Sequence, residues 1–96
     1  MRKYEVIFIV RPTVSDEECK NVFKKFADVL TNNGAKVIDE KDMGQRELAY
    51  EINDFKSGLY HYFTIEASDD QAINEFDRQA KNSSDIIRHM ITRIED

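Results

Sequence analysis

The sequence has few of the residues that stabilise small domains covalently or through metal ions. It contains one cysteine, one proline, three glycines, two histidines and no tryptophan in 96 residues. One cysteine excludes an internal disulfide, and two histidines far apart in the sequence leave too few ligands for a structural zinc site. The chain must therefore fold on an apolar core alone, which suits the reducing cytoplasm.

Long hydrophobic runs and catalytic motifs are missing as well. The apolar run at residues 6–10 is too short for a signal peptide and far too short for a membrane span. A glycine-rich phosphate loop, G-x-S-x-G and H-E-x-x-H are all absent. We therefore expect a soluble protein that is not an enzyme and that binds no cofactor or metal.

Single residues that could carry chemistry have simpler explanations. Cys19 falls on the inward stripe of a predicted helix and is expected to be a core thiol. His61 shares its strand parity with apolar neighbours, so we expect it, like His89, to be a satisfied histidine at the rim of the core. The acidic residues at 39–42 could hold a cation, but alternate strand residues diverge, which favours a solvated edge.

Composition predicts one globular domain over residues 1–96. Apolar residues make up 41% and aromatic residues 10%, enough for one modest core. Charged residues make up 34% and give a formal net charge of -5, so the chain should not bind polyanions through bulk charge. Contact with a nucleic acid would need a local patch or a basic partner.

The first third of the chain predicts a strand and a helix. Residues 4–10 are mostly apolar at both odd and even positions. This pattern is typical of a central strand, because both of its faces are buried. Ser15 stands three residues before Glu18, the spacing of a capping box, so a helix should begin near Asp16. Its apolar residues recur at three- and four-residue intervals up to Asn33-Gly34, a C-cap signal.

The middle of the chain predicts a hairpin. Residues 35–52 should form a long edge strand with a bulge or bend at Met43-Gly44, because the apolar parity shifts there. Residues 53–58 supply turn residues, and residues 59–67 return as the second strand.

The last third predicts a helix and a strand. Ser68 repeats the capping pattern with Gln71, and the helix that follows should end at residues 82–84. Residues 86–94 form a last β-branched run. The order β-α-β-β-α-β predicts an α+β, ferredoxin-like split β-α-β fold, in which a four-stranded antiparallel sheet carries both helices on one face.

The uncovered face of this sheet is expected to be aromatic, apolar and locally basic. Strand alternation assigns side chains to it, and Arg88 points outward because burying it would cost far more than burying His89. The expected face consists of Lys3, Glu5, Ile7, Ile9, Arg11, Tyr60, Tyr62, Thr64, Glu66, Arg88, Met90 and Thr92.

Cations gather on two strands that are predicted to be neighbours. Arg2, Lys3 and Arg11 lie on or beside the first strand, and Arg88 and Arg93 lie on the last. Their adjacency predicts an electropositive strip on an otherwise acidic protein. The alternative is that long cationic side chains simply solvate the strand ends.

The exposed aromatic residues allow two interpretations. Tyr60 and Tyr62 resemble the stacking aromatics of sheet-based RNA binders, but the full signature of an RNA-recognition motif is missing. Tyrosines on an open sheet more often contact a protein partner or pair across strands, and the adaptable Met90 favours a partner.

The order and spacing of four segments resemble the bacterial small-subunit ribosomal protein six family. These segments are GQRELAYEIN at residues 44–53, MRKYEV at 1–6 with Arg11-Pro12, Gly34-Ala35, and DIIRHM at 85–90. The resemblance covers nearly the whole chain, and the family has the split β-α-β fold predicted above.

The resemblance implies a structural protein of the small ribosomal subunit in the cytoplasm, without catalysis. It implies binding to the central domain of the small-subunit rRNA as a heterodimer with small-subunit protein eighteen. The expected RNA contacts are Arg2, Lys3 and Arg88, with Tyr4, Met90 and Arg93 as further candidates. The expected partner interface comprises Arg46, Tyr50, Tyr60 and Tyr62. Glu47 replaces a basic residue of many relatives, so no phosphate contact is transferred to that corner.

Two other classes of protein share this element order. A small-molecule regulatory module should have a glycine-lined pocket at a helix start, and Thr13-Val14-Ser15 offers no such glycine. An acylphosphatase-like enzyme needs an anion-cradling loop after the first strand, where Arg11-Pro12-Thr13 supplies one arginine but a proline in place of a backbone donor. Whether the sheet face or its long edge would receive a protein partner stays open at this point.

Overall fold

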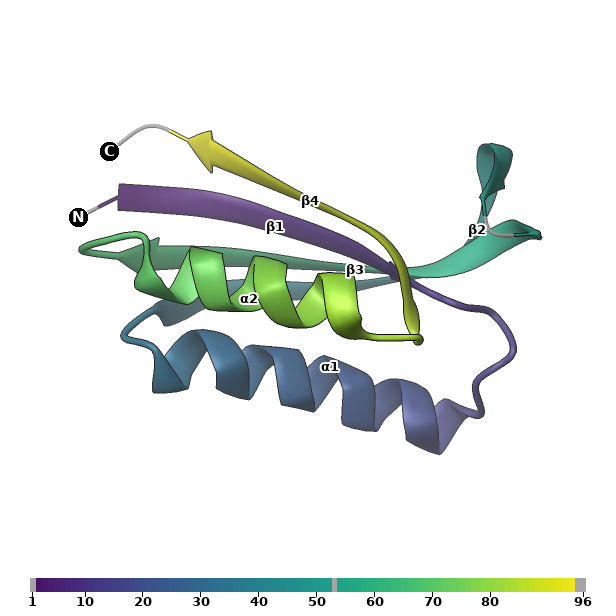
Figure 1. Cartoon of the computed structure of the whole chain (residues 1–96), viewed down its shortest axis with the longest axis horizontal. Helices are drawn as coiled ribbons and strands as arrows, with labels where there is room; N and C mark the ends of the chain where they lie inside the picture. Colours follow the sequence, from purple (N-terminus) through teal and green to yellow (C-terminus); the bar gives the residue numbers. More distant parts are fainter. Residues whose placement is uncertain (1, 53, 95–96) are drawn as a thin grey trace.

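Six elements follow one another in the predicted order in the computed structural model, which describes residues 2–52 and 54–94. The elements are β1 (Arg2–Val10), α1 (Asp16–Asn32), β2 (Lys36–Ile52), β3 (Phe55–Ala67), α2 (Gln71–Asn82) and β4 (Ile86–Ile94). The strands form one antiparallel sheet in the order β2-β3-β1-β4. Both helices lie on the same side of the sheet (Figure 1), which confirms the ferredoxin-like prediction.

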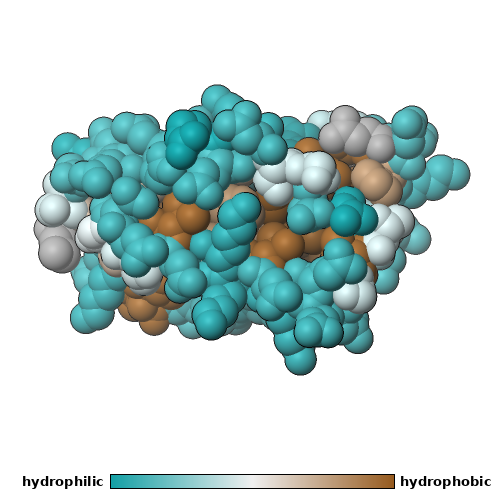
Figure 2. Space-filling model, turned by 60° about the horizontal axis from the view of Figure 1, so that its bottom comes forward, coloured by the Kyte–Doolittle hydropathy of each residue, from teal (hydrophilic) through white to brown (hydrophobic). Residues whose placement is uncertain are grey.

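The core lies between the helices and the side of β1 that faces them. Tyr4, Val6, Phe8 and Val10 alternate into it and are all buried. The Phe8 ring is central, because the rings of four phenylalanines from α1, α2 and β3 lie 5.6–5.9 Å from it. The outer side of the helix layer is mostly hydrophilic, with apolar side chains showing in patches, most of them along the middle (Figure 2).

Helix α1 begins and ends where the sequence predicts. The Ser15 hydroxyl accepts a hydrogen bond from the Glu18 backbone N–H at 3.2 Å, and the Glu18 carboxylate accepts one from the Ser15 N–H at 3.5 Å. Gly34 has φ 93 just after the helix, a conformation that glycine adopts without strain. Cys19 packs in the core as predicted, and burial raises the pKa of its thiol.

Helix α2 begins two residues later than the predicted cap implies, so the cap prediction at Ser68 is wrong. Asp70 is the N-cap residue, and the Asp69 carboxylate accepts the Gln71 N–H at 3.0 Å. The physical reason is that β3 continues to Ala67, which is buried in the core. The chain therefore needs residues 68–70 to turn before a helix can start.

The end of the β2–β3 hairpin also differs from the prediction. The last pair is Ile52 with Phe55, so β3 begins at Phe55 and not near Leu59. Asp54 takes a left-handed conformation with φ 69, which Asp tolerates in tight turns, and the predicted turn residue Asn53 lies outside the described residues. The turn is therefore much shorter than residues 53–58.

Strand β2 is an edge strand of 17 residues, as predicted, and its pairing with β3 is irregular. The register shifts between Asp42 and Gly44, which confirms the predicted bulge, and again between Val37 and Asp39. Between Glu47 and Ile52, residues 48–51 stand opposite Lys56 alone. We call residues 48–51 the arch.

The two serines of the cap patterns provide a matched test of the helix starts. Ser15→Ala should destabilise the fold by about 1 kcal/mol, because one N–H of the first turn of α1 loses its acceptor. Ser68→Ala should change stability by less than about 0.5 kcal/mol, because Ser68 is exposed and α2 does not use it. Urea unfolding measures both, and equal effects of the two substitutions would contradict the assigned caps.

Gly58 permits a close approach of β3 to the open side of β1. A Cβ at this position would overlap the Cγ2 methyl of Ile9. Gly58→Ala should therefore cost about 1–3 kcal/mol of unfolding free energy. In an Ile9→Ala background the same glycine substitution should cost much less, because the overlapping methyl is gone. Additive costs in this double-mutant cycle would show that the two residues do not interact.

Candidate nucleic-acid and partner interface

The face of the sheet opposite the helices is built from aligned cross-strand rows. One row across β2, β3, β1 and β4 is Lys41, Tyr62, Ile7 and Met90. The next row is Gly44, Tyr60, Ile9 and Arg88. The predicted aromatic and apolar face is thereby confirmed.

The middle of this open face is only partly hidden from solvent. Ile9 is 7% exposed, since it lies over Gly58, whereas Met90 on the edge strand β4 is 53% exposed. Tyr60 and Tyr62 are half-buried, and the Tyr62 hydroxyl accepts a hydrogen bond from Thr64 at 3.1 Å. Such a face offers aromatic rings and a flexible thioether to whatever covers it.

The predicted cations do not form one strip. Lys3 and Arg88 both belong to the open face, but their places on β1 are residues 3 and 9, so about 20 Å of strand separates them. Arg2 alternates to the side of the helices. Arg93 stands opposite the buried Tyr4 on that same side. The interface cations therefore divide between two faces and two ends of the sheet.

Two of these arginines are held by carboxylates. Arg2 Nη1 donates to Asp70 Oδ1 at 2.8 Å, and the Tyr4 hydroxyl donates to the same oxygen at 2.9 Å. Arg11 Nε donates to Asp85 Oδ1 at 2.9 Å. Since an ion pair cancels much of the local charge, neither arginine contributes its full charge to the surface.

Arg88 is held differently. Its Nη1 donates to the Tyr50 hydroxyl at 2.6 Å, and among the described residues no carboxylate forms an ion pair with it. Sequence reasoning placed these two residues in separate interfaces, because they are 38 positions apart and nothing in the sequence predicted the arch. A stretch in which four residues of one strand stand opposite one residue of the next leaves no clear periodic signal in the sequence.

The predicted partner residues lie at one end of the sheet and on its open face. Arg46 and Tyr50 come from β2, and Tyr50 is 62% exposed within the arch. Arg46 Nε donates to the Met43 carbonyl at 3.3 Å. Tyr60 and Tyr62 come from the adjacent strand β3. Together they give a discontinuous surface with three tyrosines.

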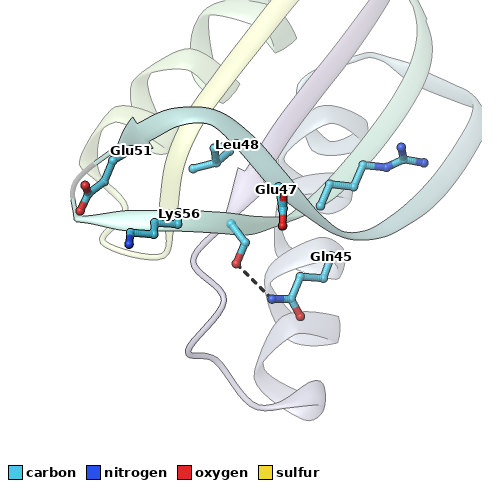
Figure 3. Close-up of a pocket in the computed structure, with 7 residues that line it drawn as sticks. Gln45, Glu47, Leu48, Glu51 and Lys56 are labelled. Atoms are coloured by element: carbon cyan, nitrogen blue, oxygen red, sulfur yellow. Dashed lines mark hydrogen bonds between the residues drawn. The ribbon is translucent and has the colours of Figure 1, made fainter.

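A hollow of about 840 Å³ lies beside the arch (Figure 3). Its walls are Gln45, Arg46, Glu47, Leu48, Glu51, Lys56 and Ser57. Gln45 Nε2 donates to the Ser57 hydroxyl at 3.0 Å, and the two cations are balanced by two carboxylates. A site for an anion or a metal would need charge of one sign, so this hollow is better explained as a by-product of the arch.

The histidines are structural. His61 is buried, stacks on Phe23 with ring centres 3.8 Å apart, and donates from Nε2 to Glu40 at 2.7 Å. It lies deeper than the predicted rim position, and its Nδ1 has no partner within the described chain. His89 Nε2 donates to Asp77 at 2.7 Å, a contact that lowers the pKa of the Asp77 carboxyl.

Features of a metalloenzyme or a membrane protein are not found in the described part of the chain. Residues 2–52 and 54–94 contain no group of three or more His, Cys, Asp or Glu side chains placed to hold a metal ion. Neither α1 nor α2 is long and apolar enough to cross a membrane. The Arg11 guanidinium after β1 also donates to Thr13 at 2.7 Å, so its hydrogen bonds are directed within the protein and not into an anion cradle.

Comparison with known proteins agrees with the fold. A 30S ribosomal protein S6 from Thermotoga maritima has a crystal structure similar to this chain, with a TM-score of 0.91 and 30% sequence identity. The match covers 97% of this chain and 87% of that one. A protein from Arabidopsis thaliana matches over 100% of this chain and 95% of its own, with a TM-score of 0.56 and 11% identity, which shows a shared fold only.

The family assignment rests on nearly the full length of the sequence. The family model for ribosomal protein S6 matches residues 3–93, which includes all of α1, β2, β3 and α2 and all but one terminal residue each of β1 and β4. That family consists of structural proteins of the small ribosomal subunit, a particle of the cytoplasm. The chain belongs to the ribosomal protein S6 family.

Proposed function

We propose that the chain binds the central domain of the small-subunit rRNA as a heterodimer with small-subunit protein eighteen. The observation that carries the proposal is the exposed edge strand β4, where Arg88 and Met90 belong to the sheet face that neither α1 nor α2 covers, while Arg93 lies on the other side of the same strand. Membership of a family of small-subunit proteins supports a ribosomal setting for this surface.

The RNA site in this proposal is built from the first residues of β1 and from β4. The residues are Arg2, Lys3, Tyr4, Arg88, Met90 and Arg93. Lys3 and Arg88 donate to phosphates or 2′-hydroxyls from opposite ends of the open face, which suits a folded RNA recognised by shape. Tyr4 is buried, so it acts by holding Asp70 beside Arg2 and does not touch RNA itself.

The protein partner is needed because the chain alone is acidic. A net charge of -5 opposes RNA binding, and a basic partner would reverse the sign for the complex. The partner interface in the proposal comprises Arg46, Tyr50, Tyr60 and Tyr62. Exposed tyrosines favour protein contact, because a ring buries apolar area while its hydroxyl keeps a polar partner.

The salt dependence of RNA binding tests this proposal. Binding to a central-domain rRNA fragment is measured with and without the partner, at several salt concentrations. With about three phosphate contacts, the slope of log affinity against log salt should be about −2 to −3. Arg88→Ala should weaken binding of the heterodimer and reduce the slope by nearly one. Arg78→Ala is the matched control, since this exposed arginine of α2 is paired with Glu75.

Two results would contradict the proposal. Equal effects of Arg88→Ala and Arg78→Ala would show that only total charge matters and would remove Arg88 from the site. Equally tight binding to unrelated RNA duplexes by the chain alone would contradict the need for a partner.

Releasing Arg2 should strengthen RNA binding. Asp70→Asn removes the carboxylate charge but keeps an oxygen that can accept from Tyr4, so the fold should be preserved. We expect the heterodimer to bind the rRNA fragment about two- to threefold more tightly, because the guanidinium of Arg2 becomes available to an RNA phosphate. The gain is small because the exposed ion pair that is lost contributes little free energy. Asp28→Asn on α1 makes the same charge change away from the proposed site. Equal gains from both substitutions would exclude a role for Arg2.

A further inference from the structure

The hydrogen bond between Arg88 and Tyr50 crosses the open face of the sheet. Strands β2 and β4 are opposite edges, with β3 and β1 between them. Edge strands of such a sheet lie about 14 Å apart, yet Arg88 Nη1 reaches the Tyr50 hydroxyl at 2.6 Å. The bond therefore requires the arch and the two long side chains to reach across the open face between them.

The strand pairing explains why the arch stands off the sheet. Glu47 pairs with Ser57 and Ile52 pairs with Phe55, so four residues of β2 face the single Lys56. The additional residues cannot enter the ladder and rise from it, as Figure 3 shows for Leu48 and Glu51. In Figure 1 the same end of the hairpin bends away from the helices. Tyr50 thereby lies on the side of the molecule that carries Arg88.

The chemistry of this contact distinguishes Arg88 from the other held arginines. Asp70 and Asp85 restrain Arg2 and Arg11 but cancel part of their charge. The Tyr50 hydroxyl is neutral, so Arg88 is restrained while its charge stays intact. One N–H of the five on the guanidinium donates to Tyr50, and within residues 2–52 and 54–94 the others make no further hydrogen bond, so they can donate to an anion.

Restraint matters because an arginine side chain has about 2 kcal/mol of rotamer entropy to lose when it is immobilised. An arginine that is already held loses less of that freedom on binding a phosphate. We propose that Tyr50 is a positioning residue for Arg88, and that its hydroxyl holds the guanidinium over the open face, ready for an RNA phosphate. This inference rests on the proposed function of Arg88 as an RNA contact.

Tyr50→Phe tests the proposal, because it removes the hydroxyl and keeps the ring of an exposed side chain. The affinity of the heterodimer for the rRNA fragment should fall between about twofold and tenfold, the range expected for one hydrogen bond. The salt slope should not change, because no phosphate contact is lost, whereas Arg88→Ala reduces it. In an Arg88→Ala background, Tyr50→Phe should have no further effect on RNA affinity.

A measurement without RNA or partner supports the test. In the isolated chain, relaxation of the Arg88 Nε–H signal by nuclear magnetic resonance should show greater mobility in Tyr50→Phe than in the parent chain. The affinity of Tyr50→Phe for the protein partner is measured separately, and RNA binding is compared at partner concentrations that saturate both the variant and the parent chain, so that loss of the heterodimer is not read as loss of RNA affinity.

The outcomes distinguish failure of the positioning role of Tyr50 from failure of the proposed RNA contact of Arg88. If Arg88→Ala leaves RNA binding unchanged, the proposed function of Arg88 fails and the role of Tyr50 fails with it. If Arg88→Ala weakens binding but Tyr50→Phe does not, the RNA contact stands and the positioning role is overturned. An additive effect of the two substitutions, or tighter RNA binding by Tyr50→Phe, would also overturn it.

Discussion

Helices α1 and α2 cover one face of the sheet, yet the central strand β1 is apolar on both of its faces. Phe8 and its neighbours fill the core, and Ile7 and Ile9 remain on the side without helices. The chain shields this second face only in part, by laying Ile9 over Gly58. Each Å² of apolar surface left in water forgoes about 25 cal/mol, so a larger assembly that covers the face is stabilised by doing so. The need to cover the second apolar face of β1 therefore makes the open face of the sheet a surface on which another molecule can dock.

The charged residues around the open face then determine what this surface can bind. The chain is acidic overall, and it restrains Arg2 and Arg11 with carboxylates at the two ends of β1. Arg88 receives a neutral partner, so its positive charge stays available on the open face. Acidic proteins bind RNA poorly alone, and an arrangement of few available cations beside apolar side chains fits a component that needs a basic partner.

Local patterns predicted the architecture well, because they depend on neighbouring residues. The Ser15 capping box, the end of α1 at Asn33-Gly34, the bulge before Gly44 and the outward side of Arg88 all follow from local chemistry or alternation. Predictions failed where distant residues decide the outcome. Ser68 does not cap α2, since residues 68–70 are needed for the turn after β3 and Asp70 takes the N-cap position. The arch, and with it the bond to Arg88, depends on a mismatch between two strands, which no single stretch of sequence encodes.

The central claim is that the open face is covered when the chain is part of a small ribosomal subunit. Met90 reports on this directly, because its thioether is exposed on that face and oxidises to the sulfoxide when solvent reaches it. Peroxide oxidation of the isolated chain and of assembled small subunits, followed by mass spectrometry, compares the two states at the same residue. We expect Met90 to oxidise several-fold more slowly in the subunit than in the isolated chain. Equal rates in the two states would contradict a covered face.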